Sequence, residues 1–114
     1  MESRRQNKIS ALIQEELGTL FQKESKNLFG GAFITVTQAR VAPDLSVAKI
    51  YISILNKERD LVMKIVKEQS NEIRKRLGNN VRHQLRKIPE LIFFLDDSLD
   101  YAEKISNLLK KKPE

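Results

Sequence analysis

The residues of this chain that are best suited to chemistry form one basic segment. From Ile73 to Ile88 the chain contains no acid and six basic residues, Arg74, Lys75, Arg76, Arg82, Arg86 and Lys87. The whole chain has 21 Lys and Arg against 15 Asp and Glu, a net charge of +6. Because the segment holds all of the excess, the remainder of the protein is neutral. A neutral body with one basic stretch indicates a polyanionic partner, such as a nucleic acid.

Apolar residues in this segment recur every three or four positions, as in an amphipathic helix. We therefore predict a basic helix from Ile73 to Ile88, ended by Pro89. Arg74 projects near the apolar stripe and must extend its stem to reach solvent. Most other cations fall on the polar face, together with His83. The candidate phosphate-binding residues of this helix are Arg74, Lys75, Arg76, Arg82, His83, Arg86 and Lys87.

A second group of cations lies near the N-terminus. Arg4, Arg5 and Lys8 fall at the start of a helix predicted from Arg4 to about Lys23. Cations at a helix N-terminus oppose the helix dipole. Their presence there is better explained by a partner than by stability, so we add them to the candidate RNA-binding residues.

The sequence supports a catalytic function less well than it supports nucleic-acid binding. His83, the single histidine, lies beside Arg82 on a polar face rather than in a pocket with a nucleophile. Asp96, Asp97 and Asp100 could hold Mg²⁺, but carboxylates at this spacing also suit the start of a helix. The chain has no phosphate-binding glycine motif. We expect no catalysis, no metal and no cofactor.

Composition further limits the class of protein to which this chain can belong. The chain has 114 residues, enough for one domain, and no cysteine, so disulfides and thiolate zinc sites are excluded. Neither a signal-type apolar block nor a membrane span is seen. Aromatic residues make up 6% and fall mostly at expected core positions, so base stacking is not expected to be the main mode of binding. We expect a cytoplasmic monomer with no membrane partner.

The elements that must position these residues follow from periodicity. After the first helix, residues 25–31 have loop composition. Alternating residues predict strands over 32–41 and 46–55, joined by the turn 42–45 into a hairpin. A second helical pattern begins near 56–60. The apolar run 91–95 predicts a third strand buried on both faces, and Asp96-Asp97-Ser98 precedes a short last helix. This is an α+β domain with helices on one face of a small sheet.

One break interrupts the helical region. The apolar stripe of the second helix lapses at Gln69 and Ser70 and returns at Ile73. We predict a kink at Gln69-Ser70-Asn71, with Asn71 as the candidate for the positive φ that a sharp kink often needs.

Two stretches resemble the ribosome-binding factor A family. The first is Thr35-Val36-Thr37 with Arg40-Val41 and the run from Pro43-Asp44-Leu45-Ser46 to Ser53. The second is Leu85-Arg86-Lys87-Ile88-Pro89-Glu90-Leu91, followed by Asp96-Asp97-Ser98-Leu99, Lys104-Ile105 and Leu108-Leu109. The resemblance covers essentially the whole chain in order, and the two motifs Pro-Asp-Leu-Ser and Asp-Asp-Ser-Leu are specific in combination.

The resemblance implies a single KH-like domain of the type II order over residues 1–109, followed by a short basic tail, 110–114. It also implies an assembly factor that binds the free small ribosomal subunit and its rRNA, supports late rRNA maturation and matters most in the cold. In place of the Gly-x-x-Gly loop, the family has a kink of the Ala-x-Gly kind. Gln69-Ser70-Asn71 matches it here, with Asn71 where the family has glycine.

Two other functions stay open on the residues alone. The first is an RNA-binding module for a structured RNA outside the ribosome, which basic charge does not distinguish from rRNA binding. The second is a metal-dependent phosphodiesterase, which requires Asp96, Asp97 and Asp100 to converge beside the basic segment.

Overall fold

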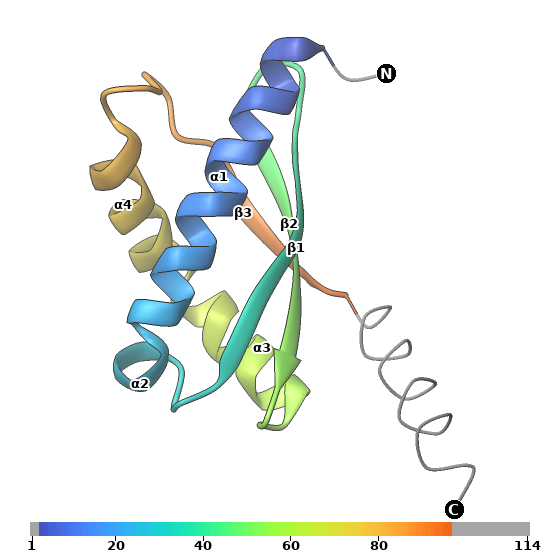
Figure 1. Cartoon of the computed structure of the whole chain (residues 1–114), viewed down its shortest axis with the longest axis vertical. Helices are drawn as coiled ribbons and strands as arrows, with labels where there is room; N and C mark the ends of the chain where they lie inside the picture. Colours follow the sequence, from blue (N-terminus) through green and yellow to red (C-terminus); the bar gives the residue numbers. More distant parts are fainter. Residues whose placement is uncertain (1–2, 97–114) are drawn as a thin grey trace, which may run out of the picture.

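The computed structural model describes residues 3–96, which form a helical layer on one face of a three-stranded sheet (Figure 1). The helices are α1 (Arg4–Lys23), α2 (Ser25–Leu28), α3 (Arg59–Glu68) and α4 (Ser70–Val81). The strands are β1 (Phe33–Val41), β2 (Val47–Leu55) and β3 (Glu90–Leu95). The predicted last helix, the Asp97-Ser98 cap and the 110–114 tail lie outside the described residues.

Helix α1 has the bounds that the sequence predicts. Ser3 and Gln6 form a capping box, in which each side chain accepts a hydrogen bond from the backbone N–H of the other residue. The Gln6 amide also donates to the carbonyl of Val41 at 3.0 Å, which ties the start of α1 to the end of β1. The predicted loop 25–31 is partly wrong, because its first residues form the single turn α2 before Gly30 and Gly31 take positive φ.

Strands β1 and β2 form the predicted antiparallel hairpin, and β3 pairs with β2 in parallel, in the order β1-β2-β3. In the turn, both the hydroxyl and the backbone N–H of Ser46 donate to one oxygen of Asp44, at 2.6 and 3.1 Å. These bonds lower the pKa of Asp44, with a smaller contribution from the charge of Lys87. These hydrogen bonds therefore stabilise the folded state fully at a pH above the pKa that Asp44 has in the unfolded chain. The stabilisation is lost as the pH falls through the lower pKa that Asp44 has in the folded protein.

The predicted break between the second and third helical segments is confirmed, but the predicted positive φ at Asn71 is wrong. Gln69 separates α3 from α4 with φ −90° and ψ 7°, and the two helices point in different directions (Figure 1). Its N–H donates to Ile65 and its carbonyl accepts from Ile73, so a single residue ends one helix and begins the next. Asn71 lies within α4 and needs no left-handed conformation.

A substitution at Asn71 distinguishes these two conformations. We expect Asn71→Ala to raise the free energy of unfolding by a few tenths of a kcal/mol, because alanine has the higher helix propensity. At a positive φ the same change costs roughly 1 kcal/mol instead. Urea unfolding measures the difference, and a destabilised Asn71→Ala variant contradicts the helical assignment.

The predicted basic helix is too long. Helix α4 ends at Val81, and the N–H groups of Gln84 and Leu85 both donate to the carbonyl of Val81 in a closing turn. The chain must turn here because β3 begins beside the hairpin. There the backbone N–H of Glu90 donates to the carbonyl of Ser46 at 2.9 Å. Leu85 still reaches the core after the turn. The apolar spacing of three and four residues therefore continues past the end of the helix.

The prediction that β3 is buried on both faces is also wrong. Leu91 and Phe93 face the helices and are buried, whereas Ile92 and Phe94 are 38% and 39% exposed. The side of the sheet opposite the helices is not covered by any described element. An apolar run in the sequence shows that both faces of the strand are apolar, but it does not show that both are buried. Here one face is open to solvent in the described part of the chain.

Candidate nucleic-acid interface

The basic residues after α4 lie in a short segment, residues 82–89, which we call the basic loop. Arg82, His83, Arg86 and Lys87 are all exposed. Between them, Leu85 and Pro89 are buried in the core. Ile88 packs over Gly78 of α4, where an added Cβ would lie 3.3 Å from a side-chain carbon of Ile88. Apolar anchors thus hold the loop in place while its charged side chains face solvent.

Arg74 has a structural contact that the sequence did not show. Its guanidinium donates to the carbonyl of Pro89 at 3.0 Å and to the carbonyl of Ile88 at 2.6 Å. Arg74 therefore ties the middle of α4 to the end of the basic loop. A helical pattern places this side chain near the apolar stripe, but it does not reveal that loop carbonyls lie within its reach.

Neutralising Arg74 should loosen this attachment. We expect Arg74→Met to lower the free energy of unfolding by about 1 kcal/mol, because two loop carbonyls lose a charged donor at a partly exposed site. Lys75→Met is the matched control, since Lys75 is an exposed neighbour with no such bonds. Thermal unfolding of both variants checks the result, and equal melting temperatures would contradict a structural role for Arg74.

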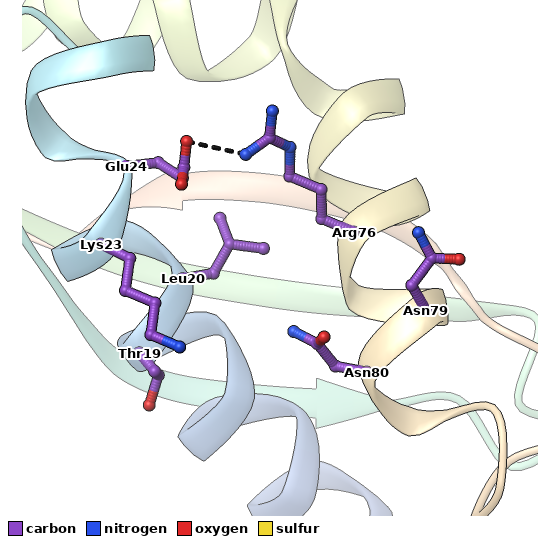
Figure 2. Close-up of a pocket in the computed structure, with 7 residues that line it drawn as sticks. All are labelled: Thr19, Leu20, Lys23, Glu24, Arg76, Asn79 and Asn80. Carbon is purple, nitrogen blue, oxygen red and sulfur yellow. Dashed lines mark ion pairs between the residues drawn. The ribbon is translucent and has the colours of Figure 1, made fainter.

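Arg76 is engaged by two acids. Its guanidinium lies 2.7 Å from a carboxylate oxygen of Glu72, one turn earlier on α4. It also lies 2.7 Å from a carboxylate oxygen of Glu24, at the end of α1, as Figure 2 shows. The hydrogen bond from Arg76 lowers the pKa of Glu72, and the same bond is the main reason that the pKa of Arg76 is raised. Glu24 is far from Arg76 in sequence, so the pairing could not be expected from the α4 pattern alone.

A polar groove lies beside this ion pair, between the end of α1 and α4 (Figure 2). It has a volume of about 250 Å³ and is lined by Thr19, Leu20, Lys23, Glu24, Arg76, Asn79 and Asn80. Lys23 and the two asparagines are polar groups that the set of candidate residues did not include. No periodic signal marks them, because the groove forms only when α1 and α4 pack together.

The remaining predicted residues are exposed, and three of them lie at one end of the molecule. Arg4, Arg5 and Lys8 are exposed at the start of α1. This end of α1 lies at the same end of the fold as the hairpin turn and the basic loop (Figure 1). Lys75 is exposed on α4. Within residues 3–96, no ion pair engages these cations or those of the basic loop, in contrast to Arg76.

The structure places two cations of the predicted set in contacts of their own and leaves the others open to solvent. The two are Arg74 and Arg76, one bound to carbonyls and one to carboxylates. Exposed, unpaired cations are the groups that can neutralise phosphates by displacing counterions. The arrangement therefore suits an extended polyanion better than a small ligand in a closed pocket.

The described residues offer no support for a metal centre, although most of the predicted cluster lies beyond them. No group of three potential ligands occurs in residues 3–96. Asp96 accepts a hydrogen bond from Thr37 at 2.5 Å, and its N–H donates to the carbonyl of Ile52. Asp97 and Asp100 lie outside the described residues. In this same part of the chain, no helix combines the length and apolar content needed to cross a bilayer.

The fold and this surface define a class of protein. The order helix, strand, strand, helix, kink, helix, strand is that of a KH-like domain of the type II order, here with a basic end. A family model described as ribosome-binding factor A matches residues 5–109. The chain belongs to the ribosome-binding factor A family, as the sequence resemblance predicted.

Individual relatives agree with this assignment. Ribosome-binding factor A of Cytophaga hutchinsonii is 48% identical over 97% of this chain and 84% of its own length. That of Prosthecochloris aestuarii is 40% identical over 94% of this chain and 88% of its own.

Solved structures show the same fold. The crystal structure of ribosome-binding factor A from Thermus thermophilus matches with a TM-score of 0.67 at 19% identity, over 79% of this chain and 94% of its own. A Thermus thermophilus homology model fitted into a cryo-EM map of a 30S complex of this factor matches with a TM-score of 0.62 at 24% identity, over 77% of this chain and 91% of its own.

Proposed function

We propose that this protein is an assembly factor that binds the free small ribosomal subunit through its rRNA. Family membership supports the choice of particle, because a Thermus thermophilus relative was fitted into a 30S complex. The observation that carries the proposal is the set of exposed, unpaired cations at one end of the fold, formed by the basic loop and the start of α1. The protein would act in the cytoplasm as a monomer and support late rRNA maturation, most of all in the cold.

The same observation supports separate proposed roles for the predicted residues. Arg82, Arg86 and Lys87 contact phosphates from the basic loop, and His83 lies among them as a further hydrogen-bond donor. Arg4, Arg5 and Lys8 extend the contact along α1. Lys75 adds a further cation from α4. Arg74 and Arg76 position the loop and α4 and touch RNA only as part of the networks that already hold them.

Sedimentation tests the choice of particle. A tagged copy is expected to follow free small subunits in a sucrose gradient and to be absent from polysomes. Migration with polysomes, or with no ribosomal particle, contradicts the proposal. Binding to a structured RNA outside the ribosome, with no subunit association, identifies the chain as a general RNA-binding module instead.

The protein is proposed to have no catalytic activity. Incubation with precursor rRNA and Mg²⁺ should leave the RNA uncut. RNA cleavage that is lost in an Asp97→Asn variant supports the phosphodiesterase alternative and contradicts a purely binding role.

A further inference from the structure

The face of the sheet opposite the helices carries exposed apolar side chains. Phe33 on β1 is 53% exposed, and Ile92 and Phe94 on β3 are 38% and 39% exposed. Alternation along each strand places Tyr51 of β2 on this same face. No helix among residues 3–96 covers it (Figure 1). Large contiguous apolar patches mark interaction sites in soluble proteins, which makes this open face a candidate.

Two aromatic rings on this face stack on each other. Tyr51 and Phe94 are register partners on β2 and β3, with ring centroids 5.3 Å apart and planes inclined by 22°. Because β3 is an edge strand, no described strand lies beyond Phe94. Within residues 3–96, Phe94 stays 39% exposed beside Tyr51, so its side chain has surface that another flat group can contact. A nucleobase placed there continues the stack, and every base has the π-face that such stacking needs.

Cations lie one row along the strands from these rings. Arg40 pairs in register with Lys49, and Lys49 pairs with Ile92. The Arg40 guanidinium lies beside Gln38, with Nε 2.8 Å from the amide oxygen when that amide is oriented to accept from it. Gln38 is in turn the register partner of Tyr51. The cations thus stand next to the aromatic pair, across all three strands.

Acids on this face lie at its ends. Glu90 is at the start of β3, in the row of Val47 and beyond the cations. Asp96 follows β3 at the other end, where it accepts a hydrogen bond from Thr37. The aromatic pair and its cations occupy the rows between them. Aromatic platforms combined with nearby cations are the means by which proteins bind single-stranded nucleic acid.

We propose that the open face of the sheet is a second nucleic-acid surface, which binds single-stranded RNA by stacking a base against the Tyr51–Phe94 pair. Arg40 and Lys49 contact the flanking phosphates. This goes beyond the proposed subunit-binding function, which uses the basic loop. It also revises the sequence-based expectation that base stacking is not a main mode, because Tyr51 and Phe94 lie on an open face rather than in the core.

Tyrosine fluorescence provides a direct readout. The chain has two tyrosines and no tryptophan, so a Tyr101→Phe variant leaves Tyr51 as its one tyrosine. The probe is an oligouridylate of about ten nucleotides, within the range that single-strand sites cover. We expect it to quench Tyr51 fluorescence in a saturable manner. An abasic strand of the same length, with the same phosphates, is expected to cause no quenching.

Phe94→Leu in this background keeps a large apolar side chain and removes the aromatic ring. We expect it to weaken oligouridylate binding about tenfold, within the range expected for loss of one stacked base. Phe33→Leu is the matched control, because Phe33 is an exposed aromatic on the same face, two rows from Tyr51. It should leave binding unchanged. Arg82→Glu with Arg86→Glu lowers the overall attraction to RNA but should keep saturable quenching that Phe94→Leu still weakens, which separates this site from the basic loop.

Four outcomes overturn the proposal. The first is the absence of quenching by oligouridylate. The second is equal binding of the abasic strand, and the third is equal loss of binding in Phe94→Leu and Phe33→Leu. The fourth is sedimentation showing a self-associated chain that Phe94→Leu returns to monomer, which assigns the face to a second copy. None of these results depends on whether the chain follows small subunits in a gradient, so the two proposals fail or succeed separately.

Discussion

Replacing Arg82 and Arg86 with glutamate should lower affinity for free small subunits by about tenfold or more, with little change in stability. Both side chains are exposed in the basic loop, and neither has an ion-pair partner in the described part of the chain. Their removal therefore breaks no ion pair within residues 3–96. Each phosphate contact that is lost also removes the release of its counterions.

Salt dependence gives this prediction its quantitative form. If each of the seven exposed cations of the proposed surface neutralises one phosphate, log affinity should fall against log salt with a slope of about −6, using the coefficient for duplex DNA as a guide. These cations are Arg4, Arg5, Lys8, Lys75, Arg82, Arg86 and Lys87. The double variant keeps five of them and should have a slope of about −4 to −5. Binding measured at several salt concentrations, with circular dichroism to verify folding, provides both numbers.

A matched charge reversal on α3 serves as the control. Lys64 and Lys67 are exposed on that helix, which lies at the opposite end of the fold from the basic loop (Figure 1). Lys64→Glu with Lys67→Glu makes the same change in net charge and should have a much smaller effect. Equal losses in the two variants indicate diffuse attraction to RNA, and a normal affinity of the Arg82 and Arg86 variant contradicts a binding site in the basic loop.

Leu85→Ala should lower both stability and subunit binding without removing any charge. Leu85 is the buried side chain that fixes the middle of the basic loop, between Arg82 and Arg86. Truncation leaves a cavity and should cost about 2–3 kcal/mol of unfolding free energy. The loop then loses the anchor that holds its cations in one arrangement, so we expect weaker binding even at temperatures where the variant is folded.

Two further variants serve as controls for Leu85→Ala. Leu85→Met conserves volume and should restore most of the stability and binding. Leu61→Ala removes an equal side chain that is 56% exposed on α3, and should change neither quantity by much. Unfolding in urea and subunit pelleting measure the two effects. Full binding by a folded Leu85→Ala variant means that the number of charges matters and their placement does not.

Helices and strands with regular burial were well predicted from the sequence. Helix α1 and the hairpin match to within a residue, because each buries one face against the sheet or the helices and shows the corresponding period. The break at Gln69 was also predictable, because the apolar stripe lapses there. Its conformation was not, since a kink can be made by Gln69 alone with an ordinary negative φ.

The end of α4 could not be predicted from periodicity. Leu85 reaches the core from a turn as readily as from a helix, so the spacing of three and four continues past Val81. The length of α4 depends on where β3 must begin beside Ser46, and that position is a property of the sheet. The exposure of Ile92 and Phe94 could not be predicted either, because it depends on which face of the sheet the helices cover.

Charge and its location were determined by the sequence alone, because the excess of cations is a property of composition and order along the chain. Which cations are available was decided by the tertiary structure. Glu24 reaches Arg76 from another helix, and the carbonyls of Ile88 and Pro89 reach Arg74 from the loop. Ion pairs and hydrogen bonds depend on distances of a few ångströms between residues far apart in sequence, and only packing sets those distances.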